Sequence, residues 1–250
     1  MKVLEDIISS ITVDAPVTDV TRGIFWTAVV SRHCGLASTM IYDCKMEDGR
    51  EPGQTSYLQT SAASLAKGAV LSSTLDASVG LAAINSLIDV DMARCIDLNA
   101  GDYLAENGQG KNITVIGHFP FVDDLRKVAK NLWVIEKRLQ PGDRPEEETG
   151  TLLARSDLIA ISSTTLINHT LGTILGLCPS GSTKMLLGPT TPLTSVLFDH
   201  GVDIISGSIV TDPDTALLGI RQGANFRALK RTGSIRLVTL MKNQRGHSLQ

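Results

Sequence analysis

The stretch Leu158-Ile-Ala-Ile-Ser-Ser-Thr-Thr-Leu-Ile-Asn-His-Thr170 decides the fold. Its first four residues form a short, continuous apolar run, which is typical of a strand that is buried on both faces of a parallel sheet. Small hydrogen-bonding side chains follow at once, where a plain surface loop would carry Gly, Pro, Asp and Lys. Ligands of parallel α/β sheets bind beyond the carboxyl ends of the strands. This stretch therefore predicts both a buried parallel strand and a ligand site at its end.

Apolar strands alternate with helical segments on either side of this stretch, from residue 112 to residue 222. The predicted strands cover residues 113–116, 132–135, 158–161, 184–187 and 202–205. The predicted helices cover residues 121–131, 151–155, 166–177, 192–200 and 214–222. Alternation of this kind, with right-handed crossovers, predicts a doubly wound, Rossmann-like parallel sheet.

The first hundred residues follow a different pattern. A strand over residues 23–30, a partner strand over 40–44 and helices over 61–67 and 75–88 predict a smaller α+β unit. The glycine-containing segment 101–111 is the expected hinge. We therefore predict an α/β protein with two domains, residues 1–108 and 109–250.

Composition excludes several classes of protein. The 250 residues carry a net charge of −3, so no basic footprint for nucleic acid is present, and the basic residues after position 226 are expected to form a solvated face. No apolar run approaches the roughly 18 residues that a membrane-spanning helix needs, and the N-terminus lacks a signal-peptide profile. We expect a cytoplasmic protein with neither a nucleic-acid nor a membrane partner; homo-oligomerisation is left open.

The four cysteines, Cys34, Cys44, Cys95 and Cys178, are widely spaced and include no C-x-x-C pair. This spacing resembles neither a disulfide framework nor a zinc knuckle, and it predicts reduced thiols.

Five loops should meet at one rim, because the carboxyl ends of parallel strands lie at the same edge of a sheet. In strand order they are Gly117-His-Phe-Pro-Phe121, Glu136-Lys137, Ser162 to Thr170, Gly188-Pro-Thr-Thr-Pro192 and Ser206-Gly-Ser208. Thr164 or Thr165 is expected to cap a helix, with neighbouring hydroxyls and Asn168 facing a ligand. Simple helix capping is the alternative explanation for these hydroxyls.

A dinucleotide site is not expected at this rim. The turn after the first parallel strand has the single glycine Gly117 instead of a G-x-G-x-x-G fingerprint. Glu136 nevertheless stands at the end of the second strand, where an acid can accept from ribose hydroxyls, so a nucleoside-type ligand stays open.

Two histidines, His118 and His169, fall on loops that should converge. A neutral imidazole can be a metal ligand or a general base, although an isolated histidine is more often structural. Asn85 lies among apolar residues of a predicted helix and needs hydrogen-bond partners there. No pair places a nucleophile beside its base, so whether the chain is an enzyme is left open.

Four segments together resemble a known family. They are Gly80-Leu-Ala-Ala-Ile-Asn85, Gly117-His-Phe-Pro-Phe121, Thr164-Thr-Leu-Ile-Asn-His-Thr170 and Leu187-Gly-Pro-Thr-Thr-Pro-Leu193. The chain is similar over nearly its whole length to a prokaryotic family of unknown function described as "putative heavy-metal chelation" proteins.

The resemblance implies an N-terminal domain like that of enolase, a Rossmann-like C-terminal domain and a site in the cleft between them. Together with the loop analysis it gives these ligand-binding candidates: Asn85, His118, Phe119, Glu136, Thr164, Thr165, Asn168, Gly188, Thr190 and Thr191. His118 and His169 are the candidate metal ligands.

Three hypotheses follow. The cleft binds a small anionic or metal-chelating ligand, in heavy-metal chelation or metal-cofactor metabolism. Alternatively, the chain is a nucleoside-cofactor enzyme of the S-adenosylmethionine type, or a metal-binding protein without catalysis. The cofactor is left open, with a divalent transition metal as the candidate.

Overall fold

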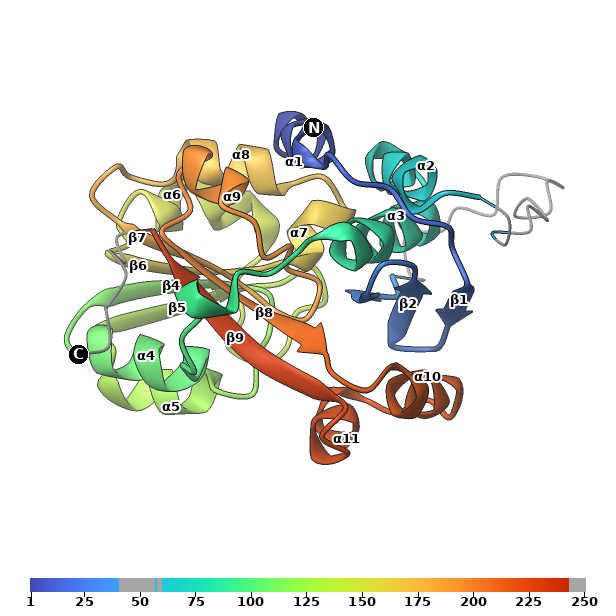
Figure 1. Cartoon of the computed structure of the whole chain (residues 1–250). Helices are drawn as coiled ribbons and strands as arrows, with labels where there is room; N and C mark the ends of the chain where they lie inside the picture. Colours follow the sequence, from blue (N-terminus) through green and yellow to red (C-terminus); the bar gives the residue numbers. More distant parts are fainter. Residues whose placement is uncertain (41–56, 58–59, 243–250) are drawn as a thin grey trace, which may run out of the picture.

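The computed structural model describes residues 1–40, 57 and 60–242. They form a mixed α/β protein with two sheets (Figure 1). A three-stranded antiparallel sheet has the order β1-β2-β3, and a six-stranded sheet has the order β5-β4-β6-β7-β8-β9. The predicted fold class, a small N-terminal α+β unit followed by a doubly wound α/β unit, is confirmed.

The larger sheet is built from six short strands. They are β4 (Asn112–Ile116), β5 (Asn131–Ile135), β6 (Leu158–Ser162), β7 (Thr183–Leu187), β8 (Ile204–Val210) and β9 (Ile235–Met241). The first five are parallel, as the continuous apolar runs predict, whereas β9 pairs antiparallel to β8. The connection from β4 leads outward to β5 and then back across β4 to β6, so the winding reverses between β4 and β6.

Helices cover both faces of this sheet (Figure 1). One face carries α4 (Ala100–Asn107) and α5 (Val122–Val128); the other carries α6 (Thr149–Leu153), α8 (Leu171–Leu177) and α9 (Val196–Asp199). Strand β6 shows why: Leu158 and Ala160 belong to one buried cluster, and Ile159 and Ile161 to the other. Successive side chains of a strand point to opposite faces, so an uninterrupted apolar run fills two cores at once.

The N-terminal sheet consists of β1 (Asp19–Arg22), β2 (Trp26–Val30) and β3 (Cys34–Ser38). One of its faces is covered by α3 (Thr74–Leu87), which also packs against α2 (Ala62–Ala66) and the 3-10 turn η1 (Lys67–Val70). Glycines allow α3 to lie close to its neighbours. A Cβ at Gly35 of β3 would overlap the backbone of α3, and a Cβ at Gly80 of α3 would overlap the backbone of Ala69 in η1. The small residues of the predicted helix therefore serve packing.

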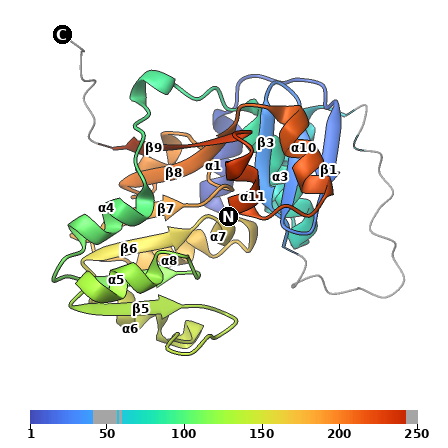
Figure 2. The same cartoon turned by 90° about the horizontal axis from the view of Figure 1, so that it is seen from below.

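The C-terminal helices α10 (Pro213–Arg221) and α11 (Phe226–Arg231) cover the other face of the N-terminal sheet (Figure 2). Trp26 and Leu36 of that sheet share a buried cluster with Leu217 and Leu229. The helix α1 (Lys2–Ser10) in turn packs against α9 and α8 of the larger unit. The N-terminal helix α1 thus packs on the larger unit, and the C-terminal helices α10 and α11 pack on the N-terminal sheet.

Several predicted elements are wrong in detail. The expected hinge over 101–111 is mostly helix α4, whose first turn is capped by the Asn99 side chain (2.9 Å to the amide of Gly101). The strand β2 begins at Trp26 rather than at residue 23 and pairs with β3. The expected partner strand over 40–44 falls mostly outside the described residues. The basic segment after position 226 contains α11 and the strand β9, neither of which was predicted.

The single helix predicted over 166–177 is two helices, α7 (Thr164–Ile167) and α8, separated by three residues. His169 has a φ of 61°, in the left-handed region, which interrupts the helix. Thr164 and Thr165 do not cap α7 as expected, because the residue before the helix is Ser163 and it makes no side-chain cap. Within the described part of the chain, no helix has the length and apolar character needed to cross a bilayer.

Candidate ligand-binding site

A cavity of about 480 Å³ opens where the winding of the sheet reverses. It is lined by Gly117 after β4, Glu136 after β5 and Ser162 at the end of β6, and Met40 of the N-terminal unit borders it. The reversal point is where open α/β sheets bind ligands, because the loops there diverge and leave a crevice. The first three of the five predicted loops therefore line one cavity.

Gly117 has a structural reason to be glycine. Its φ is +98°, and a Cβ on it would lie 3.0 Å from the Cβ of Ser162. A larger residue would be strained and would push the ends of β4 and β6 apart. Glycine thus keeps the floor of the cavity narrow and leaves Ser162 accessible to its interior.

Hydroxyl groups form one side of the cavity. The hydroxyls of Ser162 and Thr164 lie 2.8 Å apart and share a hydrogen bond. Thr165 is buried and donates its hydroxyl to the carbonyl of Ser162 at 2.6 Å. Thr165 therefore supports the loop, whereas the Ser162–Thr164 pair retains hydrogen-bonding capacity toward a ligand.

Asn168 presents donors on the same side. Its Oδ1 accepts from the Thr170 hydroxyl at 2.7 Å and from the Thr170 amide at 3.2 Å. These two bonds fix which end of the carboxamide is oxygen. Among the described residues, Nδ2 has no hydrogen-bond partner, and Asn168 lines the cavity. Two N–H donors are therefore available for the oxygen atoms of a ligand.

Carboxylates form a different part of the lining, from Glu136, Glu146 and Glu147, with Lys137 as a basic neighbour. Glu136 Oε1 accepts a hydrogen bond from the backbone amide of Lys137 at 2.8 Å, which holds the side chain in place. Oε2 takes no part in this bond. The Lys137 ammonium lies 4.0 Å from Glu146 Oε1. This part of the cavity carries more negative than positive groups, whereas the Asn168 side offers donors.

The two predicted metal-binding histidines are held differently. His169 Nε2 lies 2.8 Å from the carbonyl of Ala69 in the N-terminal unit, so this nitrogen carries the hydrogen and donates it. Nε2 therefore cannot bind a metal in this arrangement, whereas Nδ1 keeps the lone pair that a metal ligand needs, and His169 is part of the cavity lining. His118 is not among the residues that line the cavity; its Nδ1 faces Asp143 Oδ2 at 3.5 Å.

Asp143 is a residue that sequence reasoning missed. Its side chain is 0% exposed, and its Oδ2 accepts from the amide of Gln140 at 3.0 Å. Its Oδ1 is buried and has no partner in the described part of the chain. It lies in the connection after β5, whose polar and acidic composition indicates a solvent-exposed loop. The available signal was Pro141-Gly142-Asp143, a turn motif that can bury its aspartate against the backbone.

The remaining predicted residues lie elsewhere. Phe119 stacks on Phe121 with ring centroids 5.0 Å apart. Gly188 has a φ of +123°, and a Cβ on it would lie 2.8 Å from Ser163 Oγ. Thr191, in the loop after β7, and Ser208, inside β8, line a second cavity beside Asn85; the predicted loop over 206–208 is wrong, because these residues belong to β8.

Thr190 joins the two units. It is fully buried, and its Oγ1 accepts from the backbone amide of Ser38 at 2.9 Å. Its carbonyl accepts from Asn85 Nδ2 at 3.1 Å. Both atoms of Thr190 that a ligand would need are therefore committed to the N-terminal unit.

Fold and cavity together define a two-unit α/β protein with a cavity at the reversal point of its larger sheet. Two family models match the chain, DUF4213 over residues 4–88 and DUF364 over residues 99–239, and both are described as "Putative heavy-metal chelation". The chain belongs to the DUF364 family. The predicted family is confirmed, and the predicted boundary between residues 108 and 109 stays a prediction.

Solved structures of the same family are similar over almost the whole chain. A protein of unknown function from Desulfitobacterium hafniense DCB-2 has a TM-score of 0.85 at 25% identity, covering 96% of this chain and 98% of that one. A protein of unknown function from Pyrococcus horikoshii has a TM-score of 0.80 at 19% identity, with the same coverage. The latter shows the fold alone.

An uncharacterized protein of Methanocaldococcus jannaschii is 29% identical over 163 residues. The match covers 62% of this chain and 63% of that protein, so it spans less than two thirds of the relative.

The family description raises the question of whether these residues fit a bare metal ion. Among residues 1–40, 57 and 60–242, no group of three or more His, Cys, Asp or Glu side chains could hold one. Burial raises the pKa of Cys34 to about 12 and that of Cys178 to about 11, which disfavours the thiolate that binds metals. The described side chains therefore do not fit a complete metal site of their own.

Proposed function

We propose that this protein binds a small metal-chelating molecule together with its metal ion, in the cavity at the reversal point between the two units. The observation that carries the proposal is that one lining holds donor groups, Asn168 and the Ser162–Thr164 pair, and carboxylates around Glu136. The donor side begins at the end of β6 and the carboxylate side at the end of β5, and β4 lies between these two strands.

A metal chelate likewise has two kinds of group, anionic oxygen atoms and a metal cation. Its anionic oxygen atoms accept hydrogen bonds, and bonds to charged acceptors are stronger than bonds to neutral ones. Its metal ion favours nearby carboxylates. A free anion would meet the carboxylates of the lining, and a free metal ion would find too few ligands, so the complex suits the cavity better than either component.

The shortage of protein ligands supports the same proposal. A tight site for a borderline metal needs three or four His, Cys or carboxylate ligands. If the chelator supplies most of them, the protein needs to provide only a shaped cavity and hydrogen bonds. A cavity of about 480 Å³ is within the usual range for small-molecule sites.

The test compares the 1:1 zinc–citrate complex, citrate alone and zinc alone by isothermal titration and by thermal unfolding. We expect the complex to bind more tightly than either component and to raise the melting temperature, because a ligand at 100 times its Kd stabilises the folded state by about 2.7 kcal/mol. The same comparison with iron and nickel citrates covers other metals. Equal or tighter binding of the free metal, or no binding by any chelate, would contradict the proposal.

Two substitutions test separately what the donor side and the carboxylate side of the cavity contribute to binding. Asn168→Asp keeps the oxygen that accepts from Thr170 but replaces the Nδ2 donors by a charged oxygen, so we expect at least a roughly tenfold loss of affinity for chelator and complex alike. Glu136→Gln removes a charge on the other side and should weaken the complex more than the metal-free chelator.

Asn107→Asp is the matched control, because the same chemical change falls at the exposed end of α4. It should leave the affinity unchanged. Stabilisation by adenosine or S-adenosylmethionine, sensitive to Glu136→Gln, would favour the nucleoside-cofactor hypothesis instead.

A further inference from the structure

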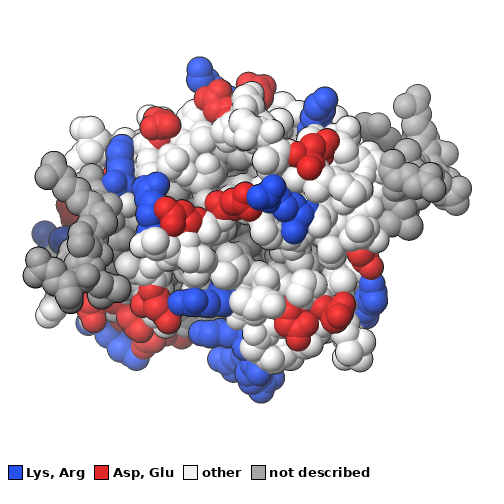
Figure 3. Space-filling model, viewed as in Figure 1, with Lys and Arg blue, Asp and Glu red and all other residues white. Residues whose placement is uncertain are grey.

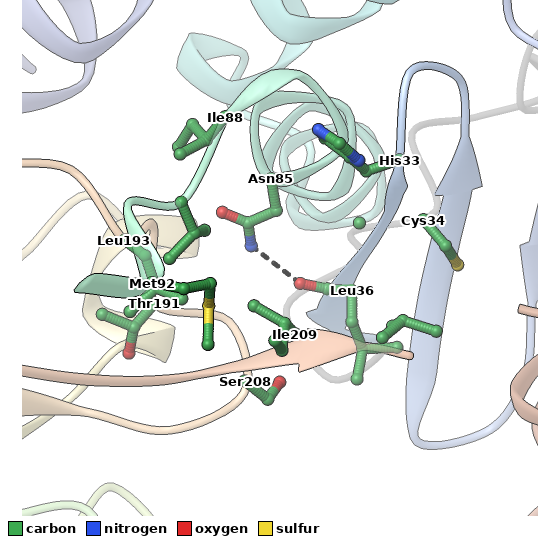
Figure 4. Close-up of a pocket in the computed structure, with 13 residues that line it drawn as sticks. His33, Cys34, Leu36, Asn85, Ile88, Met92, Thr191, Leu193, Ser208 and Ile209 are labelled. Carbon is green, nitrogen blue, oxygen red and sulfur yellow. Dashed lines mark hydrogen bonds between the residues drawn. The ribbon is translucent and has the colours of Figure 1, made fainter. Parts of the chain in front are cut away.

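A second cavity, of about 200 Å³, lies between the two units and is separate from the site proposed above (Figure 4). The N-terminal unit contributes Leu36, Asn85 and Ile88 to its lining. The larger unit contributes Leu193, Ser208 and Ile209. Most of these side chains are apolar, and Asn85 is the carboxamide among them.

The orientation of the Asn85 amide is fixed by its neighbours. Nδ2 donates to the carbonyl of Leu36 at 2.8 Å and to the carbonyl of Thr190 at 3.1 Å. Carbonyl oxygens only accept, so the nitrogen must occupy this position and the amide cannot be reversed. The oxygen Oδ1 consequently points the other way, toward the side of Ile88 and Leu193 in Figure 4.

Asn85 Oδ1 is buried and has no hydrogen-bond partner among the residues that the structure describes. Buried polar atoms in folded proteins nearly always have a partner, in the protein or in a bound molecule. One N–H of this amide is bonded within the N-terminal unit, to Leu36, and the other joins the units through Thr190. Among the described residues, no donor lies within hydrogen-bond distance of Oδ1, which faces the apolar side of the cavity at Ile88 and Leu193.

The other polar groups of the lining do not supply one. Thr191 donates its hydroxyl back to the carbonyl of Gly188 at 2.7 Å, and Ser208 Oγ lies 3.4 Å from the carbonyl of Pro189. His33 Nε2 is 2.7 Å from the carboxylate of Asp89. In Figure 4 the thiol of Cys34 points away from Asn85.

We propose that this second cavity binds a small, neutral, mainly apolar molecule that donates one N–H or O–H hydrogen bond to Asn85 Oδ1. Neutrality follows from the lining, whose described residues include no Asp, Glu, Lys or Arg to pair with a charge. The volume is somewhat larger than the roughly 150 Å³ of an apolar cavity that accepts benzene, so a one- or two-ring heteroaromatic molecule matches it in size.

The decisive comparison uses indole and benzofuran, which have nearly the same shape, with an oxygen in benzofuran in place of the N–H. Binding is measured on the full chain by isothermal titration and by the shift of the melting temperature. We expect indole to bind at least ten times more tightly than benzofuran. Equal binding of the two would overturn the proposal, because the cavity would then select only for apolar character.

Substituting Asn85 itself would also break its bond to Thr190, which joins the units, so the cavity is blocked at another position. Ile209→Trp fills the space and leaves the Asn85 amide intact, and it should abolish indole binding. Ile24→Trp, the same change at a residue that is 59% exposed, should not. Persistence of indole binding in Ile209→Trp would place the ligand elsewhere and overturn the proposal.

A crystal structure grown with indole gives the direct test. Indole density with its nitrogen within hydrogen-bond distance of Asn85 Oδ1 would support the site, and a water molecule in that position with no indole would overturn it. Asn168→Asp should bind indole as the unsubstituted protein does, so failure of the chelate proposal and failure of this one are distinguishable.

Discussion

Asp89 is a residue whose ionisation depends on its neighbours. His33 Nε2 lies 2.7 Å from Oδ1, and Arg32 Nη2 lies 2.5 Å from Oδ2. These hydrogen bonds, first that of His33 and then that of Arg32, lower the pKa of Asp89 below its usual 3.8. They join the turn between β2 and β3 to the end of α3, at the edge of the cavity beside Asn85.

The pH dependence follows from the direction of this shift. Because the pKa is lower in the folded state, the carboxylate stabilises the fold above pH 3.8, and this contribution is lost as the pH falls from 3.8 through the lower folded value. The double variant Arg32→Gln/His33→Gln should raise the pKa of Asp89 toward 3.8, as measured by NMR titration of the carboxyl carbons.

Asp212 serves as the internal control for that titration. Its pKa is lowered by hydrogen bonds from Thr215, which the double variant does not touch. An unchanged pKa for Asp89, or an equal rise at Asp212, would show that the pairing with Arg32 and His33 is not the cause.

At the scale of the elements, the packing of α3 on η1 depends on the absence of a side chain at position 80. In Gly80→Ala the new Cβ would overlap backbone atoms of Ala69, which cannot move aside as the end of a flexible side chain could. We expect a loss of about 1–3 kcal/mol or more in the free energy of unfolding, which is the usual effect of overpacking.

Gly172→Ala is the matched control, since a Cβ there meets nothing within 4 Å and the residue is also helical. It should be neutral, or stabilising by up to about 1 kcal/mol because alanine favours the helix. Urea denaturation of both variants measures the difference. Equal stability of the two variants would mean that α3 and η1 are not in the close contact described.

Elements with purely local signals could be predicted from the sequence. The five parallel strands were found because each contains a short, mainly apolar run, such as Leu158 to Ile161. The run predicted over 202–205 overlaps only the first two residues of β8, which continues to Val210. The strand β9 was missed because Arg236 and the basic residues around it suggested a solvated surface. As an antiparallel strand beside β8, it does not need to be apolar throughout.

The helix boundaries that failed have two different causes, a misinterpreted local motif and a break that depends partly on a contact distant in the sequence. The segment 101–111 contains Asn107-Gly108, a pair that is typical of a linker. In the structure Asn107 is instead the last residue of α4, and Gly108 is its C-cap. The break between α7 and α8 comes from the Asn168–Thr170 hydrogen bonds and from the bond between His169 and Ala69, one hundred residues away. Apolar periodicity continues across this break and does not reveal it.

At the scale of the whole molecule, the two units are joined by buried hydrogen bonds at Thr190. Thr190→Val keeps the shape of the side chain but leaves the backbone amide of Ser38 without its acceptor. We expect a loss of about 1–3 kcal/mol in the free energy of unfolding, the usual cost of an unsatisfied buried donor.

Thr191→Val makes the same change one residue along, also at a buried position. Its hydroxyl bonds only the carbonyl of Gly188, which keeps a second bond from the Thr191 amide at 3.0 Å. We expect a smaller loss, measured by the same denaturation curves. A larger loss for Thr191→Val than for Thr190→Val would contradict the assigned role of Thr190.

The candidate site could be predicted in part. Convergence of the loops after the first three parallel strands follows from sheet topology, and it led to Gly117, Glu136 and Asn168. The division of the five loops between two cavities could not be predicted, because it depends on how the N-terminal unit docks against Thr190 and Thr191. Acidic and basic side chains are interspersed on the face shown in Figure 3, so surface charge gives no additional guide to a binding site there.

The packing of α10 and α11 on the N-terminal sheet has a consequence for biosynthesis. A ribosome produces β1, β2 and β3 early, but the helices that shield Trp26 and Leu36 emerge almost two hundred residues later. The nascent chain must carry this unshielded apolar surface through most of translation. Chaperone contact during synthesis should therefore concentrate on residues 26–36 and end only after residue 231 has left the exit tunnel.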